Sequence, residues 1–179
     1  TTIGSMAFYG CHFAKENFRN SSSLDSETNS CWGATLYDYE TEDGLLINDT
    51  IAEYCRFYAD NVVIPDDVTY IKEYAFSNCD SLTSVTIGKA VTNIGKGAFS
   101  GTRLQTIICK FIEIPDLSSS VFYTNMYNHT QVYVPEGTYW DYAFSGWGNF
   151  VRIKEMAMDA EGLEKSKAYM IADASGRNY

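Results

Sequence analysis

The 179-residue chain has few basic residues, and this shortage excludes several classes of partner. Only 13 Lys and Arg stand against 23 Asp and Glu, which gives a formal net charge of −10. Phosphate groups bind to basic stripes, so the composition argues against nucleic acid and against an anionic membrane surface. No run of apolar residues is long enough to predict a transmembrane helix. We therefore expect no membrane insertion in this segment.

Residues that carry catalysis or bind metal ions are also scarce. The chain has two histidines, His12 and His129, and no C-x-x-C pair, so we expect no metal site. The acids in 38–43 match a calcium loop poorly, because Gly44 comes one place late and no Glu closes the loop. Cys31 and His129 could form a nucleophile pair by composition only, and the acids near Cys31 disfavour its thiolate. No phosphate-binding, dinucleotide-binding or nucleophile-elbow motif is present. The sequence therefore predicts no cofactor and no enzyme activity.

The five cysteines have no spacing typical of a disulfide framework. They are Cys11, Cys31, Cys55, Cys79 and Cys109. Cys11 and Cys79 both lie three residues after the Phe of an Ala-Phe pair, and Thr102 occupies the same place one repeat later. A place shared by Cys and Thr is typical of a small buried spacer, so we predict free structural thiols.

What the chain does contain is a repeat of about 23 residues. Residues 62–84 align with 85–107 at this offset, and eight of the first eighteen positions are identical. Ordinary composition predicts about one such identity. A period of this length is typical of a solenoid, in which each unit buries its apolar side against its neighbours.

Each unit has a fixed order of apolar positions. The pattern L-x-x-V-x-I at 82–87 recurs as L-x-x-I-x-C at 104–109. Its alternation predicts a strand in which every second side chain is turned inward. Pro65 or Gly88 then ends the strand, because Pro supplies no donor and Gly accepts turn dihedrals. An Ala-Phe pair follows, which we expect on the back of the stack, where Ala allows close approach and Phe fills volume.

The full pattern V-x-I-P-x-x-V-T-x-I-x-x-x-A-F-x-x-C-x-S-L-T-S at 62–84 resembles the BspA-like leucine-rich repeats of bacterial, Bacteroides-type surface proteins. The similarity continues through 85–106, is partial at 2–11, and includes a terminal unit at 132–153. The resemblance implies a β-rich α/β solenoid of leucine-rich-repeat type. It also implies a secreted or cell-surface protein whose function is adhesion-type binding.

The domain organisation follows from where the period holds. We expect a solenoid over 1–154, made of half a repeat (1–11), an insertion (12–61), clear repeats (62–109), and a degenerate repeat with an aromatic cap (110–154). Residues 155–179 would be a C-terminal extension, the start of a truncated following module. Because the chain begins inside a repeat, we expect a segment of a longer protein that can self-associate end to end.

Three further elements are expected. Within 44–61, the residues that could lie along one face of a helix are Ile51, Tyr54, Cys55 and Tyr58, but the family resemblance implies a β-hairpin that leads into the next repeat, and we favour the strands. Thr138 is expected to cap a helix over 139–145. The side chains expected to face inward from this helix are Tyr139, Tyr142, Ala143 and Phe144. The residues expected in the last strand are Phe150, Val151 and Ile153.

The stacked strands offer the first candidate binding surface. By the alternation above, one outward row contains Val63, Thr86, Ile108 and Tyr133, and the neighbouring row contains Asn61, Ser84, Thr106 and Gln131. The first row is uncharged in an acidic chain, so we predict that it meets a ligand together with Ser84 and Thr106. Exposed strand positions favour β-branched residues for structural reasons too, which leaves a purely structural interpretation open. The second candidate is the pair Tyr37 and Tyr39 in the insertion.

Two functions remain open from the sequence. The first is a non-enzymatic adhesion module at the cell surface or outside the cell that recognises a host or bacterial protein or a glycan. The alternative is a structural spacer that presents a neighbouring catalytic or carbohydrate-binding module.

Overall fold

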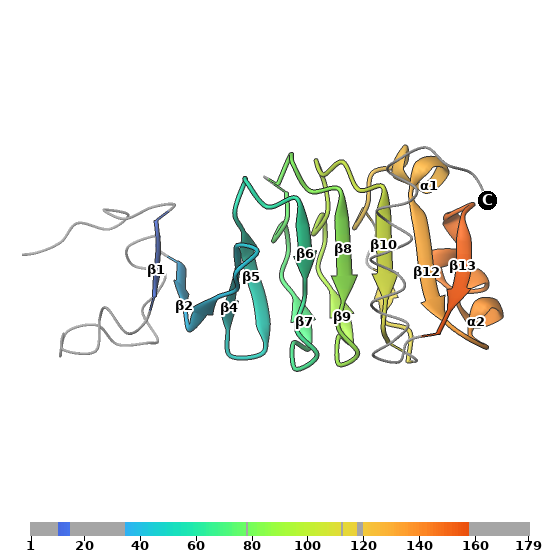
Figure 1. Ribbon diagram of the computed structural model, residues 1–179, viewed down its shortest axis with the longest axis horizontal. Coiled ribbons are helices and arrows are strands. Elements are labelled where there is room, and N and C mark those ends of the chain that lie inside the picture. Colours follow the sequence, from blue (N-terminus) through green and yellow to red (C-terminus); the bar gives the residue numbers. More distant parts are fainter. Residues whose placement is uncertain (1–10, 15–34, 78, 112, 118–119, 158–179) are drawn as a thin grey trace, which may run out of the picture.

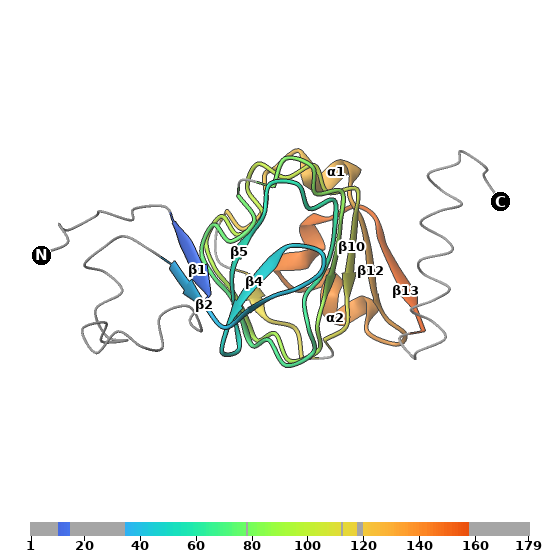
Figure 2. The same cartoon turned by 60° about the vertical axis from the view of Figure 1, so that its left-hand side comes forward.

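The computed structural model describes residues 11–14, 35–77, 79–111, 113–117 and 120–157, and it consists mainly of short parallel strands (Figure 1). One sheet has the strand order β13-β12-β10-β8-β6 and the other has the order β11-β9-β7-β5-β4-β3. Figure 2 shows the two sheets on opposite sides of the interior. The apolar core therefore lies between the sheets.

The elements have the following bounds. The five-stranded sheet contains β6 (Asn61–Val63), β8 (Ser84–Ile87), β10 (Thr106–Cys109), β12 (Gln131–Pro135) and β13 (Ile153–Met156). The six-stranded sheet contains β3 (Tyr39–Glu40), β4 (Leu45–Asn48), β5 (Ile51–Cys55), β7 (Tyr70–Ile71), β9 (Asn93–Ile94) and β11 (Asp116–Leu117). A third, parallel pair consists of β1 (His12–Ala14) and β2 (Thr35–Tyr37). The helices are α1 (Met126–His129), α2 (Tyr139–Ala143) and the 3-10 helix η3 (Gly146–Asn149).

Neighbouring strands pair in the register that the sequence repeat predicts. In one sheet, the residues that lie side by side are Val62, Val85 and Ile107. In the other, they are Ile71, Ile94 and Leu117. The offset is 23 residues at each of these steps except between β8 and β10, where it is 22. Equivalent apolar side chains therefore stack directly on one another, which is how each unit buries its neighbour's core face.

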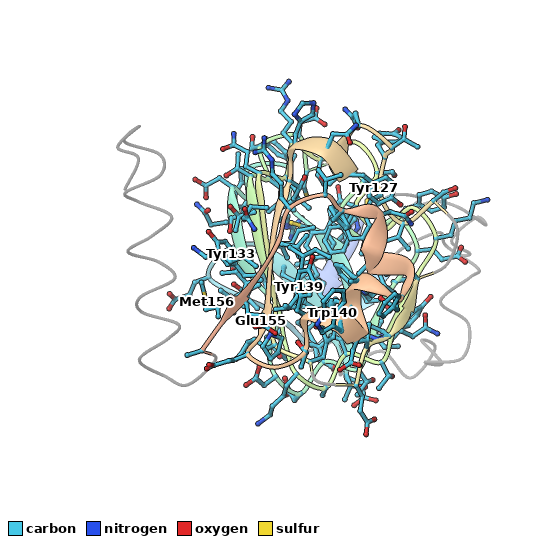
Figure 3. The ribbon with its side chains drawn as sticks, turned by 90° about the vertical axis from the view of Figure 1, so that its right-hand side faces the viewer. Tyr127, Tyr133, Tyr139, Trp140, Glu155 and Met156 are labelled. Carbon is cyan, nitrogen blue, oxygen red and sulfur yellow. The ribbon has the colours of Figure 1, made fainter. Side chains whose placement is uncertain are left out.

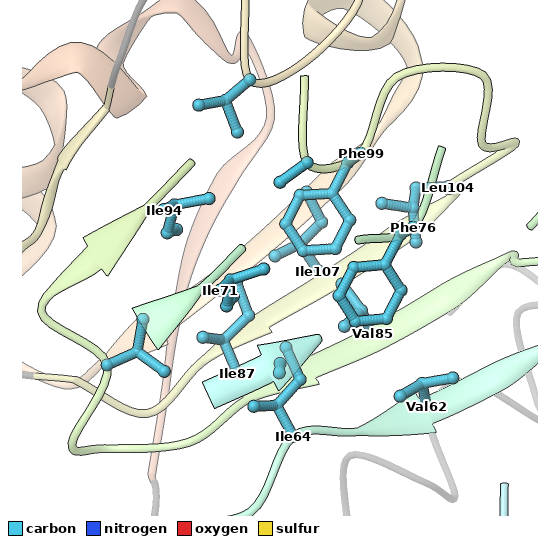
Figure 4. Packing of buried hydrophobic residues seen from close by; sticks show 14 of the residues in the cluster. Val62, Ile64, Ile71, Phe76, Val85, Ile87, Ile94, Phe99, Leu104 and Ile107 are labelled. Atoms are coloured by element: carbon cyan, nitrogen blue, oxygen red, sulfur yellow. The ribbon is translucent and has the colours of Figure 1, made fainter. Parts of the chain in front are cut away.

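The aromatic residues of the Ala-Phe pairs form a column along the interior. The ring centroids of Phe76 and Phe99 lie 4.8 Å apart and those of Phe99 and Phe122 lie 5.3 Å apart, with nearly parallel planes. Figure 4 shows the first two rings stacked among the aliphatic side chains of the core. The column ends on Trp147 and Phe150, whose ring centroids lie 5.5 and 5.1 Å from that of Phe122.

The third unit keeps this arrangement although its sequence led us to expect degeneration after Cys109. Leu117 pairs with Ile94 in the six-stranded sheet. Phe122 takes the place of Phe99 in the column, with Val121 in place of Ala98. The pattern was hard to see because the residue types change, with Val121 in place of Ala98 and Leu117 in place of Ile94.

Two glycines allow neighbouring units to approach closely at the corners. A Cβ atom at Gly88 would lie 2.2 Å from the carbonyl oxygen of Pro65, and one at Gly95 would lie 2.5 Å from the backbone nitrogen of Glu73. Real Cβ contacts are never this short, so the backbone of one unit rests directly on that of the previous one. Gly88 also follows the last residue of β8, as predicted.

The N-terminal hairpin belongs to the six-stranded sheet. Strands β4 and β5 are antiparallel, which confirms the hairpin expected over 44–61. β5 then pairs in parallel with β7, through Ile51 with Tyr70 and Ala52 with Ile71. This segment therefore adds a rung to the stack, whereas we had counted it as part of an insertion.

The C-terminal unit departs from the prediction in three ways. Helix α2 ends at Ala143, and the Thr138 hydroxyl donates to the Pro135 carbonyl at 2.7 Å instead of capping the helix. Phe144 is 84% exposed because it lies opposite Tyr142 on the helical turn, and Tyr139, which was also expected to face inward, is 37% exposed. Strand β13 begins at Ile153, so the expected strand residue Val151 lies before it and is exposed.

We predict that the aromatic column contributes strongly to stability. Phe99→Ala removes the ring that touches both Phe76 and Phe122, and it should lower the free energy of unfolding by about 3–5 kcal/mol. Phe57→Ala, at an exposed ring, should change it by less than about 0.5 kcal/mol. Urea denaturation followed by circular dichroism measures both. Similar losses in the two variants would contradict the prediction.

We also predict that Gly88 is required for the close contact between units. Gly88→Ala pushes a Cβ into the Pro65 carbonyl and should cost about 2 kcal/mol or more. Gly137→Ala is the matched control, because it meets no atom within 4 Å but has a φ of +85°. It should cost about 1 kcal/mol from backbone strain alone. Thermal unfolding of both variants checks the difference, and a Gly88→Ala variant no less stable than the control would refute it.

Candidate binding surfaces

The strand row predicted as a ligand surface is aligned as expected. Val63 pairs with Thr86, Thr86 with Ile108, and Ile108 with Tyr133 across β6, β8, β10 and β12. The neighbouring row aligns in the same way and contains Asn61, Ser84, Thr106 and Gln131. β13 adds Lys154 beside Tyr133, so the first row ends in a charged residue.

The same row is not a continuous exposed surface. Val63 is 44% exposed, but Ile108 is only 2% exposed and Thr86 is also buried. In the neighbouring row, Ser84 is buried as well. A side chain in the middle of a sheet has neighbours on both sides at about 4.8 Å, whereas one on an edge strand has a neighbour on one side only. Val63 lies on the edge strand β6. A ligand lying on this face could therefore reach Val63 and the half-buried Thr106 and Tyr133, but little of the residues between them.

The second candidate pair lies on strands and not in a loop. Tyr37 ends β2 and is half-buried, while Tyr39 begins β3, is exposed, and pairs with Ile47. Burial and the nearby carboxylates of Asp67 and Asp38 raise the pKa of Tyr39. The two tyrosines are close in sequence, but they lie in different sheets.

An ion pair fixes the turn that follows β5. The Arg56 guanidinium binds both carboxylate oxygens of Glu40 at 3.2 and 3.1 Å, and the Tyr58 hydroxyl donates to the same group at 3.0 Å. The hydrogen bond from Arg56 holds the pKa of Glu40 below its usual value, against the effect of burial. The contact between Arg56 and Glu40 ties the turn to β3 and leaves Phe57, which is 70% exposed, at the tip.

The cysteines in the described part of the chain are free and mostly buried. Cys55, Cys79 and Cys109 are buried, and Cys11 is half-buried. The Cys79 thiol donates to the Cys55 carbonyl at 3.1 Å. Thr102, at the equivalent position of the next unit, donates its hydroxyl to the Phe99 carbonyl at 2.8 Å. Burial raises the pKa of Cys109, and a hydrogen bond with Cys79 together with burial raises that of Cys55. Cys55 and Cys109 are therefore poor nucleophiles, and the three buried cysteines fill space in the core.

The C-terminal unit carries a cluster of exposed aromatic side chains that the sequence analysis missed. Tyr139, Trp140 and Phe144, which we call the cap cluster, lie on or directly after α2, and the last two are 67% and 84% exposed. Figure 3 shows Tyr139 and Trp140 beside Glu155 at the C-terminal end. The i, i+4 spacing of Trp140 and Phe144 puts both rings on one side of the helix, away from Tyr142, but it does not show which side faces the core.

The described residues hold no arrangement that points to metal binding. No group of three or more His, Cys, Asp and Glu side chains gathers in that part of the chain. His129 is exposed at the end of α1, and its suggested partner Cys31 lies outside the described residues, as do residues 1–10 of the expected half repeat. Within the same ranges, no helix is long and apolar enough to cross a membrane.

These parallel ladders, with equivalent residues about 23 positions apart, are typical of leucine-rich-repeat proteins. The pattern described as the BspA type leucine-rich repeat region matches residues 47–158 in six copies. The match covers more than half of the chain, which therefore belongs to this family. It begins inside the expected insertion and runs through the third unit and the C-terminal unit. Comparison with curated proteins and with solved structures found no match.

We predict that the cysteine place tolerates threonine but not a larger side chain. Cys79→Thr should change the free energy of unfolding by less than about 1.5 kcal/mol, since Thr102 fills the equivalent place and bonds its own unit's carbonyl. Cys79→Leu overpacks the same place and should cost about 1–3 kcal/mol. Chemical denaturation of both variants tests this. A Thr variant as unstable as the Leu variant would show that the thiol itself is needed.

Proposed function

We propose that the chain is a non-enzymatic binding module, secreted or displayed at a cell surface, that recognises a host or bacterial protein or a glycan. The observation that carries the proposal is the exposure of large aromatic side chains on rigid supports. Phe57, Trp140 and Phe144 each expose most of their surface, at a turn and at the cap. Exposed aromatic groups mark interaction sites, because their burial by a partner removes much apolar area from water.

The stacked scaffold supports this function physically. We propose that the units form a solenoid, in which each rung is held by its two neighbours through strand pairing and the aromatic column. Side chains presented by such a scaffold lose little conformational freedom when they bind, so more of the contact energy appears as affinity. Membership of the BspA-type family is in keeping with adhesion-type binding.

We place the binding surface on the exposed aromatic groups and not on the strand row. The row offers Val63 and half-buried neighbours, while its central members are buried. The Glu40–Arg56 ion pair already satisfies the charged groups beside Phe57, so the exposed ring is the group left for a partner at that turn. Tyr39 adds a second exposed ring on β3.

We predict saturable binding of the intact chain to at least one member of a panel of extracellular matrix proteins and glycans. Surface plasmon resonance on the immobilised panel would compare three variants, Phe57→Ser, Trp140→Ser/Phe144→Ser and Val63→Lys. We expect one of the two aromatic variants to lose about tenfold or more in affinity, as truncation of a binding hot spot does. Val63→Lys should leave the affinity unchanged.

The outcomes separate the proposal from its alternatives. Loss of binding in Val63→Lys alone would return the site to the strand row. No binding to any panel member, with folding verified by circular dichroism, would contradict the proposal and favour a spacer that presents a neighbouring module.

A further inference from the structure

Helix α2 presents the cap cluster in a fixed position. The Tyr142 hydroxyl donates to the Phe111 carbonyl at 2.8 Å, and the ring of Tyr142 is fully buried. One carboxylate oxygen of Glu155 accepts from the backbone N–H groups of Gly137 and Tyr139 at 3.0 and 2.9 Å. The helix is thus fastened to the core on one side and to strand β13 at its start. Its outer side, which carries Trp140 and Phe144, is free to meet a partner.

The rings of the cap cluster form one surface. The centroids of Trp140 and Phe144 lie 5.8 Å apart with their planes inclined by 21°. Tyr139 packs its edge against Trp140, with centroids 5.1 Å apart and planes 84° apart. Ring faces carry negative electrostatic potential and attract cations, Trp most strongly. Two neighbouring rings with similar tilt can therefore hold a guanidinium or ammonium group together with its alkyl stem.

The charges around the cluster also favour a cationic ligand. Residues 131–151 include two acids, Glu136 and Asp141, and no Lys or Arg. Both acids are exposed, and Asp141 lies next to Phe144 on the circumference of the helix. The whole chain has a net charge of −10, which attracts cationic partners at long range.

Among the described residues, the basic residues nearest in sequence, Arg152 and Lys154, lie away from the site where α2 contacts β13. Lys154 lies beside Tyr133 in the sheet, and strand alternation puts it on the opposite face from Glu155, which is the residue that contacts α2. Arg152 precedes β13, at the opposite end of the strand from Met156. Its backbone carbonyl accepts from Val132, near the start of β12, whereas α2 follows the end of β12.

We propose that the cap cluster binds a cationic segment of a partner protein, with Arg or Lys side chains against the Trp140 and Phe144 rings and paired with Asp141. This proposal rests on the proposed function and names the partner's chemistry. Neutral sugars also stack on exposed rings, but they gain nothing from the surrounding negative charge. The combination of ring faces and carboxylates, with no Lys or Arg between residues 131 and 151, favours the cation.

The test uses the full chain and a fluorescein-labelled octa-arginine peptide, with binding followed by fluorescence anisotropy at low and high salt. We expect saturable binding that weakens as salt rises, because screening shortens the range of the charge interaction. Trp140→Ser/Phe144→Ser keeps every charge and should weaken binding by about tenfold, from the loss of two cation–π contacts. Asp141→Asn should weaken it about threefold. Tyr123→Ser removes an exposed ring that belongs to neither proposed surface and should have no effect.

Two results would overturn the proposal. Equal affinity of the wild type and Trp140→Ser/Phe144→Ser for octa-arginine would show attraction by net charge alone. Binding of maltohexaose that is lost in the same variant, with octa-arginine unaffected, would make the cluster a glycan site. Either result leaves the proposed binding function standing if the panel still shows saturable binding, whereas absence of all binding would contradict both.

Discussion

The structure depends on one constraint, the parallel register that puts equivalent residues of successive units side by side. Backbone hydrogen bonds set this register in both sheets, for example from Ile64 to Thr86 and from Gly95 to Ile71. Once it is set, the stacking of Phe76, Phe99 and Phe122 and the close approach at Gly88 follow from sequence identity alone. A shift of one residue would turn every apolar side chain to the wrong face, so the pattern of burial in turn fixes the register.

The units that repeat in sequence were predictable because each position there is set by its equivalent in the next unit. Val85, Ile87 and Leu82 are buried as expected, and Cys79 and Thr102 share one place. Exposure on the outer row was less predictable. Alternation shows which face a side chain points to, but the burial of Ile108 depends on what its neighbours cover. Ser84, Thr86 and Ile108 were predicted to meet a ligand on the outer face, and all three are buried.

The C-terminal unit shows a second limit of reading the sequence. Whether Phe144 or Tyr142 faces the core depends on the rotation of a five-residue helix. A contact far along the chain sets that rotation, the hydrogen bond from the Tyr142 hydroxyl to Phe111. An aromatic residue in such a segment is equally suited to filling the core or to remaining exposed. Local pattern alone cannot separate the two, and this is why the cap cluster was missed.

The two ends of the stack are closed by different means, and the comparison bears on function. At one end, the Asp43 carboxylate accepts the N–H of Val63 at 2.7 Å, which occupies a donor on the edge strand β6 and opposes strand pairing with another chain. At the other end, Tyr142, Trp147 and Phe150 cover the core. Trp147 is buried so deeply that its indole N–H has no hydrogen-bond acceptor in the described structure. This unsatisfied donor destabilises the fold, but the ring closes the interior. Trp140 and Phe144 take no part in that closure. Rings that remain exposed do not stabilise the fold. Contact with a partner therefore explains the large aromatic residues at these positions better than a structural role does.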